Sequence, residues 1–361
     1  MPATAREEPM KHMLDLLEVL STCPGPPGGE EPVARLIRRH LEPWCKITRD
    51  GLGSLIAEKT GTRDKPRVML TAHMDEVGFI VQNITSQGYL RLQPLGGWFA
   101  GQLPGQRLHI HGSRGPAEGI IGAVPPHFRK EEKGEIKIDE LLVDVGASSP
   151  EEVESLGLRI GDLVTPVSRF AVFNNKLLAN KAWDDRVGCA VLVAAMGQLG
   201  NHPNTVVATA TVQEELGSRG AVTAVEVARP QVAVVLEGPP ADDFPGIAKD
   251  NPQGVLGKGC QVRLYDPSTI IHRRFWEWVI DLARERNLPH QIAVRQTGAT
   301  DAKAIHLAQG GIPTVVLGVP VRHAHSHSGL IHVDDVQATL ALTLAILEEI
   351  DEAVFASLLP A

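Results

Sequence analysis

Two kinds of hydrophobic pattern alternate along the chain. Short apolar runs that end in polar residues have the pattern of buried parallel strands, and they lie at Val68–Ala72, Thr205–Val212, Val232–Leu236 and Thr314–Leu317. Stretches with apolar residues at helical spacing lie around them, at Leu14–Leu20, Glu31–Leu41, Arg186–Leu199, Gly220–Ala228, Thr269–Arg286, Asp301–Ala308 and Val333–Leu359. Strands that alternate with helices predict an α/β fold with a mostly parallel central sheet flanked by helices.

The pattern changes between about Val77 and Ser168, where Gly and Pro are frequent and only Pro150–Leu156 has helical spacing. Short alternating runs at Arg107–His111 and Ile136–Ile138 predict strands there. We interpret this segment as a small β-rich domain inserted into the α/β fold. The α/β domain would then consist of residues 1–75 and 169–361, and residues 76–168 would form a β-barrel-like insert.

Side chains that can bind a metal ion follow the predicted strands. The first strand is followed by His73-Met74-Asp75-Glu76, the second by Glu214-Glu215, the third by Glu237, and the fourth by Arg322, His323, His325 and His327, while Asp184-Asp185 precedes a helix. Ligands bind at the carboxyl ends of strands in an open parallel sheet. Each group alone is explained as well by a loop, a helix cap or a solvated surface. Their joint placement favours a common site.

This set of side chains is typical of a two-metal hydrolase. Two imidazoles and three carboxylates suit two ions of the zinc, cobalt or manganese type. Paired ions need a bridging carboxylate, and either Asp184 or Asp185 is suited to that role. One member of the pair Glu214 and Glu215 can bind a cation, and the other can accept a proton from the attacking water.

Composition and charge argue against nucleic-acid and membrane partners. The formal net charge is −8 and no Lys/Arg-rich run occurs, which argues against nucleic-acid binding. The chain has no apolar run of about 18 residues and no signal-peptide pattern, so we expect no membrane partner. Its four cysteines are scattered without a C-x-x-C pair. These features predict a cytoplasmic protein.

The residues around these positions resemble the M42 family of metallo-aminopeptidases, the tetrahedral type. The matching motifs are Ala72-His73-Met74-Asp75-Glu76-Val77-Gly78-Phe79, Asn180-Lys181-Ala182-Trp183-Asp184-Asp185-Arg186-Val187-Gly188, Val212-Gln213-Glu214-Glu215-Leu216-Gly217, Glu237-Gly238, Asp243-Phe244-Pro245-Gly246, Thr297-Gly298-Ala299-Thr300-Asp301-Ala302 and Arg322-His323-Ala324-His325-Ser326. Each motif is short. Together they run in order through almost the whole chain, and the set is specific.

The resemblance implies a metal ligand set. His73 would bind one metal ion, His325 would bind the other, and Asp184 would bridge them. Glu215 and Glu237 would each complete the coordination of one ion. The cofactors would be two divalent ions per subunit, zinc or cobalt, with manganese as a third candidate.

The resemblance also implies roles for the remaining residues. Glu214 would be the general base that takes a proton from a water activated by the two ions. Asp75 would orient His73 through the free ring nitrogen of the imidazole. The peptide bond between Asp184 and Asp185 is expected to be cis. The remaining candidates would either support the metal ligands or line the substrate pocket. They are Asp185, Thr300, Asp301, Arg322 and His323.

At the level of the whole protein, the resemblance implies a zinc-peptidase type of fold. The insert would be a dimerisation domain, and dimers would build a hollow tetrahedral dodecamer. The protein would remove N-terminal residues from peptides. The preferred N-terminal residue cannot be read from the sequence.

Four positions depart from the family pattern, and the least consequential is Ser54, where Asn is usual. Glu237 stands where Asp is usual, His323 where Tyr is usual, and Ala299 where Gly is usual. His323 and His327 therefore compete with His325 as candidate ligands, although the adjacent Ser326 matches the His-Ser pair of the family and favours His325.

Other functions stay open at this point. A deacylase or carboxypeptidase of the related M20 type would need a cationic anchor for a substrate carboxylate. A glycosidase would use the acid pair, but aromatic residues make up only 4% of the chain and the histidines have no place in that chemistry. A non-catalytic metal-binding scaffold would need the ligands but not Glu214.

Overall fold

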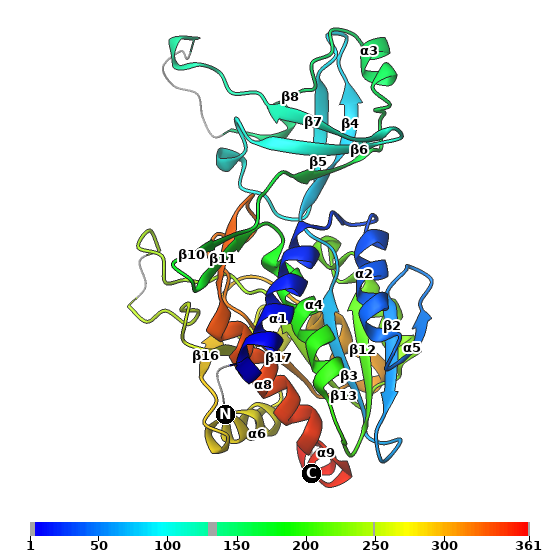
Figure 1. Cartoon of the computed structure of the whole chain (residues 1–361), viewed down its shortest axis with the longest axis vertical. Helices are drawn as coiled ribbons and strands as arrows, with labels where there is room; N and C mark the ends of the chain where they lie inside the picture. The colour runs from blue at the N-terminus through cyan, green and yellow to red at the C-terminus, as the bar shows by residue number, and fades with distance from the viewer. Residues whose placement is uncertain (1–3, 129–135, 248–249, 360–361) are drawn as a thin grey trace.

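A nine-stranded mixed sheet forms the centre of the larger of two bodies in the computed structural model, which describes residues 4–128, 136–247 and 250–359 (Figure 1). Its strands are β1 (Lys46–Arg49), β2 (Leu55–Thr60), β3 (Arg67–His73), β12 (Thr205–Thr211), β13 (Val232–Glu237), β14 (Cys260–Asp266), β15 (Thr269–Ile270), β16 (His290–Val294) and β17 (Thr314–Gly318). They are ordered β1-β2-β12-β3-β13-β17-β14-β15, and β16 pairs with β14.

The four central strands carry the predicted parallel arrangement. β3 pairs in parallel with both β12 and β13, and β13 pairs in parallel with β17. Every residue of β12, β13 and β17 is buried, which explains their continuous apolar runs. Antiparallel strands extend the sheet on both sides, because β2 pairs with β12 and β14 with β17 in that sense. The predicted fold class is confirmed, and the margins make the sheet mixed.

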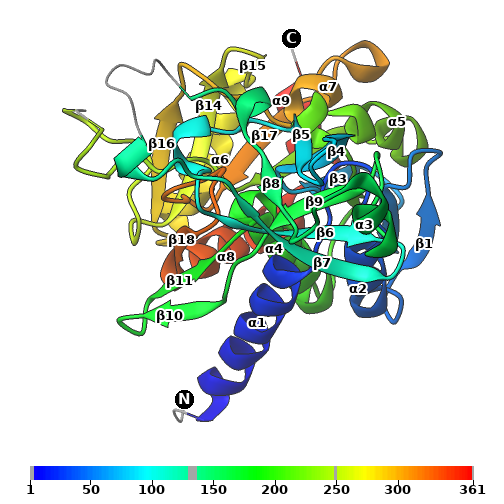
Figure 2. The ribbon, with the colours of Figure 1, turned by 90° about the horizontal axis from the view of Figure 1, so that it is seen from above.

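Helices cover both faces of this sheet (Figures 1 and 2). They are α1 (Thr4–Thr22), α2 (Glu31–Leu41), α4 (Trp183–Gln198), α5 (Arg219–Ala228), α6 (Arg273–Glu285), α7 (Ala302–Ile305), α8 (Val333–Glu349) and α9 (Glu352–Leu358). The first face holds α1, α2, α4 and α8, which pack around α4, and α4 packs on β3 and β13. On the other face α5 contacts β12 and α7 contacts β17. No helix among the described residues has the length and apolarity needed to cross a membrane.

Three predicted helices were too long. The stretch Thr269–Arg286 begins as strand β15, which pairs with β14, and turns helical only at Arg273. Within Asp301–Ala308, only Ala302–Ile305 is α-helical, and a 3₁₀ turn follows at Ala308–Gly310. The stretch Val333–Leu359 is interrupted because the side chain of Asp351 accepts a hydrogen bond from the backbone of Val354 at 2.8 Å and caps a new helix.

The smaller body is a closed barrel with its own apolar core. Its strands are β4 (Gly78–Ile84), β5 (Leu90–Leu95), β6 (Arg107–Gly112), β7 (Gly115–Ile121), β8 (Val143–Asp144) and β9 (Leu163–Pro166). The core contains Phe79, Leu92, Ile110 and Val164 and is separate from the core of the larger body. Helix α3 (Pro150–Ser155) has its predicted position, whereas Ile136–Ile138 forms no strand and leads into a 3₁₀ turn at Ile138–Glu140.

A small third sheet lies beside the junction of the two bodies (Figure 1). It consists of β10 (Ala171–Phe173), β11 (Leu177–Asn180) and β18 (Gly329–His332). The chain passes directly from the carboxyl end of β3 into the barrel, so the barrel stands over the edge where the parallel strands end. Side chains that follow those strands therefore lie between the two bodies.

Candidate active site

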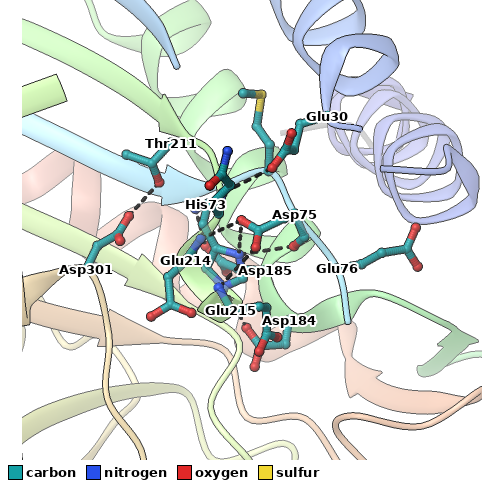
Figure 3. Close-up of polar contacts among 12 residues, drawn as sticks. Glu30, His73, Asp75, Glu76, Asp184, Asp185, Thr211, Glu214, Glu215 and Asp301 are labelled. Atoms are coloured by element: carbon teal, nitrogen blue, oxygen red, sulfur yellow. Dashed lines mark hydrogen bonds and ion pairs between the residues drawn. The ribbon is translucent and has the colours of Figure 1, made fainter. Parts of the chain in front are cut away.

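The five residues proposed as metal ligands come together at this edge, and Figure 3 shows three of them, His73, Asp184 and Glu215. One group consists of His73 at the end of β3, Glu237 at the end of β13 and Asp184 at the start of α4. A second group consists of Asp184, Glu215 and His325. Within each group, the candidate ligand atoms lie within 4.8 Å of one another. Asp184 belongs to both groups, as a bridging carboxylate requires.

The two oxygens of Asp184 face different histidines. The Nε2 atom of His73 lies 3.0 Å from Oδ1, and the Nε2 atom of His325 lies 3.3 Å from Oδ2. His325 Nε2 also lies 3.1 Å from Oε1 of Glu215. The peptide bond between Asp184 and Asp185 is cis, as the resemblance implied.

Two of these carboxylates retain unused acceptor capacity, as ligands of a divalent cation would. The Oε1 atom of Glu215 is buried and forms no hydrogen bond of good geometry, although Nε2 of His325, another candidate ligand, lies 3.1 Å from it. The carboxylate of Glu237 is also buried and forms no hydrogen bond or ion pair with any residue that the structure describes. Buried carboxylate oxygens without partners are costly, and a metal ion satisfies them. Two nitrogen-and-oxygen triads that share one carboxylate match the donor chemistry of two ions of the zinc type.

The clustering of carboxylates at the site also favours a bound cation. Burial raises the pKa of Glu237 well above its ordinary value, and the neighbouring charges of Asp184 and Asp185 raise it further. Burial also raises the pKa of Glu215, where Asp184 adds to the effect. A cation between such carboxylates stabilises their charged forms.

Asp75 supports the site differently from the expectation. Its backbone carbonyl lies 3.1 Å from Nδ1 of His73, nearer than its own carboxylate oxygen at 3.5 Å. The carboxylate of Asp75 instead accepts hydrogen bonds from the backbone N–H groups of Glu214 at 2.9 Å and Glu215 at 3.0 Å. Residue 75 thus orients the histidine through its main chain and fixes the glutamate pair through its side chain.

Asp185 is turned away from the candidate ligands. One of its oxygens accepts a hydrogen bond from the backbone of His73 at 3.2 Å, and the other accepts one from the backbone of Gly188 at 3.0 Å. Asp185 is fully buried and ties the end of β3 to the start of α4. Between the two candidates for the bridge, the geometry favours Asp184.

Glu214 lies beside the ligands without belonging to either group. Burial raises the pKa of its carboxyl well above the ordinary value, and the charges of Asp301, Glu215 and Asp75 contribute. The hydroxyl of Ser218 donates a hydrogen bond to it at 3.3 Å. A carboxylate with a raised pKa beside a cation site is suited to general-base chemistry.

Thr300 and Asp301 contact residues that flank the pair Glu214 and Glu215. The carboxylate of Asp301 accepts a hydrogen bond from the hydroxyl of Thr211 at 2.5 Å, and the carbonyl of Thr300 accepts one from Ser218 at 3.4 Å. Both residues are buried. The cavity wall nearby is formed by Thr297, Gly298 and Ala299.

The other candidates near His325 have different partners. Arg322 is paired with Asp243, to which Nε donates at 2.7 Å and Nη2 at 2.5 Å. His323 is exposed, with its ring centroid 5.3 Å from that of Phe244. His327 is buried with its ring 5.6 Å from Trp98, and burial lowers its pKa to about 4. Of the three histidines, only His325 joins a candidate metal group among the described residues.

The barrel contributes residues that sequence reasoning missed. The carbonyl of Gly97 accepts a hydrogen bond from Nδ1 of His325 at 2.8 Å, and the side chain of Gln102 donates one to the His325 carbonyl at 2.7 Å. Gly96 adopts a φ of 86°, and a Cβ there would lie 3.0 Å from Oε2 of Glu215. This segment ends in the 3₁₀ turn η1 (Ala100–Gln102), and we name it the β5–η1 loop (residues 96–102). It holds His325 at two points. Nothing in its local pattern indicates that contact.

A buried ionic cluster below the site was also missed. Nζ of Lys181 lies 2.6 and 2.7 Å from the two carboxylate oxygens of Glu76, and Nη2 of Arg186 lies 3.6 Å from one of them. Arg186 also donates to the carbonyls of Met74 at 2.7 Å and Leu20 at 2.6 Å. The cluster joins α1, the β3–β4 connection and α4, the segments that position His73 and Asp184.

One cavity of about 380 Å³ opens onto the candidate ligands. Its lining includes Glu214 and four of the candidate ligands (Asp184, Glu215, Glu237 and His325). Arg263, Arg295 and the 297–299 segment also line it. Its volume lies in the range of small-molecule sites.

Comparison with known proteins identifies this arrangement as that of a peptidase. The model of the family described as M42 glutamyl aminopeptidase matches residues 53–342. The lysyl aminopeptidase of Pyrococcus furiosus is 35% identical over 84% of this chain and 87% of its own length. The glutamyl aminopeptidase of Lactococcus lactis is 32% identical over 90% of this chain and 92% of its own.

Solved structures give the same result. The TET aminopeptidase from a marine sediment archaeon (Thaumarchaeota) superposes with a TM-score of 0.93 at 37% identity, covering 97% of this chain and 99% of its own. The Pyrococcus horikoshii TET1 peptidase superposes with a TM-score of 0.84 at 31% identity, covering 94% of this chain and 100% of its own. The protein is therefore a peptidase. The chain belongs to the M42 glutamyl aminopeptidase family, and its activity is that of an aminopeptidase.

Proposed function

We propose that the protein is a dinuclear metal-dependent aminopeptidase that hydrolyses N-terminal residues from peptides. The observation that carries this proposal is the position of Asp184, whose two oxygens face His73 and His325 in separate ligand groups. His73 and Glu237 would hold one ion, and Glu215 and His325 would hold the other. The ions would be zinc or cobalt, with manganese as a third candidate.

The chain's own residues would carry the proton chemistry. When bound, the two ions supply Lewis-acid polarisation of the scissile carbonyl and lower the pKa of the attacking water. Glu214 takes the proton from that water at its carboxylate and later gives it to the leaving amine. Glu215 and Glu237 offer negative charge to the free α-amine of the substrate, which explains a requirement for an unblocked N-terminus. A non-catalytic scaffold would have no use for Glu214.

The first test is hydrolysis of a panel of aminoacyl-p-nitroanilides with matched N-acetylated controls. We expect cleavage of free-amine substrates only, complete loss of activity after chelation, and recovery on addition of zinc or cobalt, because the ligands alone cannot polarise the carbonyl. Absence of cleavage by the fully metallated protein would overturn the proposal. Cleavage of the acetylated substrates would indicate a deacylase of the M20 type instead.

We further propose the division of the chain into a catalytic domain of residues 1–75 and 169–361 and a dimerisation domain of residues 76–168. The barrel exposes Phe99 and Phe128, whose relative exposures are 73% and 76%, and exposed aromatic residues are common in interfaces. The TET1 neighbour assembles into a tetrahedron or an octahedral shell, which supports a tetrahedral dodecamer built from dimers here. Multi-angle light scattering distinguishes a dimer from a dodecamer. The four free cysteines support a cytoplasmic location.

Replacement of Gln102 by leucine tests the role of the β5–η1 loop. We expect the affinity for one of the two ions to fall by about 10- to 100-fold, because loss of a group that orients a ligand has costs of that size. Titration of the apoprotein with zinc measures this directly. Gln106→Leu, at an exposed position four residues further along the chain, is the matched control. Two unchanged zinc affinities in Gln102→Leu would contradict an orienting role.

A further inference from the structure

The buried ion pair between Glu76 and Lys181 joins the two chain segments that carry two of the candidate metal ligands. Glu76 follows His73 by three positions, and Lys181 precedes Asp184 by three positions. At the candidate site, Nε2 of His73 lies 3.0 Å from Oδ1 of Asp184. At the other end of the same two segments, Nζ of Lys181 lies 2.6 and 2.7 Å from the two oxygens of Glu76. The ligands and the ion pair thus fix one arrangement of the two segments.

Two further contacts make this junction continuous. The carboxylate of Asp185 accepts a hydrogen bond from the backbone of His73 at 3.2 Å. Nε of Arg186 donates a hydrogen bond to the carbonyl of Met74 at 2.7 Å. Both of these contacts join a side chain to the main chain, whereas the ion pair consists of two side chains. Both members of the ion pair can therefore be replaced together, without loss of either backbone contact.

Stability is a weak explanation for an ion pair in this position. Glu76 is 1% exposed and Lys181 is 5% exposed, so both charges have lost most of their contact with water. Burial lowers the pKa of Lys181, and the charge of Glu76 opposes this shift. Well-packed neutral residues of similar volume often stabilise a fold as much as a buried ion pair or more, because no charge loses its hydration. A fixed geometry of the two segments explains the pair better.

Neither side chain is placed to take part in the chemistry. Among the residues that the structure describes, neither belongs to a candidate cation group nor lines the cavity, and Figure 3 shows Glu76 pointing away from the candidate ligands. The ligands of the second ion have other supports, because Asp75 holds the backbone of Glu215 and the β5–η1 loop holds His325. The ion pair therefore acts mainly on the ion that His73 would bind.

We propose that Glu76 and Lys181 are positioning residues that preorganise the cation group of His73. This inference rests on the proposed two-metal site. Ligands that already have the binding geometry lose less conformational freedom when the cation binds, so preorganisation appears as affinity. Loss of a group that orients a metal ligand typically lowers metal affinity by about 10- to 100-fold, and we expect an effect of that size here.

The experiment replaces both members of the pair and compares zinc affinity with stability. Glu76→Gln/Lys181→Met removes both charges without changing the net charge, and the introduced amide keeps an acceptor for the backbone N–H of Gly25. We expect the affinity for one of the two zinc ions to fall by about 10- to 100-fold. The unfolding temperature of the apoprotein should stay close to that of the wild type. Zinc titration against a competing chelator and thermal unfolding of the same apoprotein measure the two effects.

The matched control is Glu58→Gln/Arg67→Met, which removes an ion pair of 2.8 Å from the opposite end of β3. Both zinc affinities should keep their wild-type values in this control. Lys181→Met alone leaves the buried charge of Glu76 without its nearest partner and should lower both the unfolding temperature and the zinc affinity. Glu76→Met/Lys181→Met is a second neutral pair and covers a folding failure of the first.

The outcomes separate this inference from the proposed function. If the wild type does not bind two zinc ions, the two-metal site itself fails. If the wild type binds two ions and the neutral pairs bind them with unchanged affinity, the aminopeptidase proposal stands and the positioning role is overturned. The role is also overturned if zinc affinity falls only where stability falls, or if neither neutral pair folds, because the ion pair would then be a determinant of folding.

Discussion

Glu214→Gln is expected to lower kcat by about 10²–10⁴-fold while two metal ions remain bound. Glutamine has nearly the shape of glutamate but cannot take a proton from water. Glu214 lies outside both ligand groups, so its replacement leaves the predicted coordination intact. KM should change little, because the lost interaction belongs to the transition state. Steady-state kinetics and metal analysis of the same preparation measure both effects.

The matched control is Glu226→Gln, which removes an exposed carboxylate of α5 and should leave kcat unchanged. Two results would count against the general base. Nearly full turnover by Glu214→Gln would show that another group accepts the proton. Loss of one ion from this variant would make Glu214 a metal ligand.

The positions of the candidate ligands could be predicted because they depend on local patterns. His73 and Glu237 end strands whose residues are continuously apolar, and the carboxyl ends of parallel strands share one edge. The pairing of β3 with β12 and β13 then brings those ends together without further information. The roles of Asp184 and His325 needed the resemblance to a family, because neither residue ends a strand.

Other parts of the site depend on contacts between distant segments. Gln102 reaches His325 across 223 positions of the sequence, and Arg263 meets the cavity only because β14 adds to β17 at an antiparallel margin. Neither contact has a local signature. The segment Cys260–Asp266 was not predicted as a strand, so Arg263 could not be placed on the cavity wall. Long-range packing determines these residues, and the sequence pattern indicates them only after the fold is known.

His325→Ala is expected to remove one metal ion per subunit and nearly all activity, whereas His323→Ala is expected to keep both. The imidazole of His325 lies within 3.3 Å of both Asp184 and Glu215. Burial lowers the pKa of His325, but the two carboxylates outweigh this effect and raise the pKa to about 11. The same negative field stabilises a bound cation. Loss of a ligand should cost more than the roughly 10- to 100-fold in metal affinity that loss of an orienting partner costs.

The three histidines differ in their surroundings, so the variants give separate answers. His323 is exposed and faces Phe244, and His327 is buried beside Trp98. Metal stoichiometry by mass spectrometry, with kcat/KM on one p-nitroanilide, should place both His323→Ala and His327→Asn near the wild type. If His323→Ala loses an ion and His325→Ala retains both, the metal ligand is His323 and not His325.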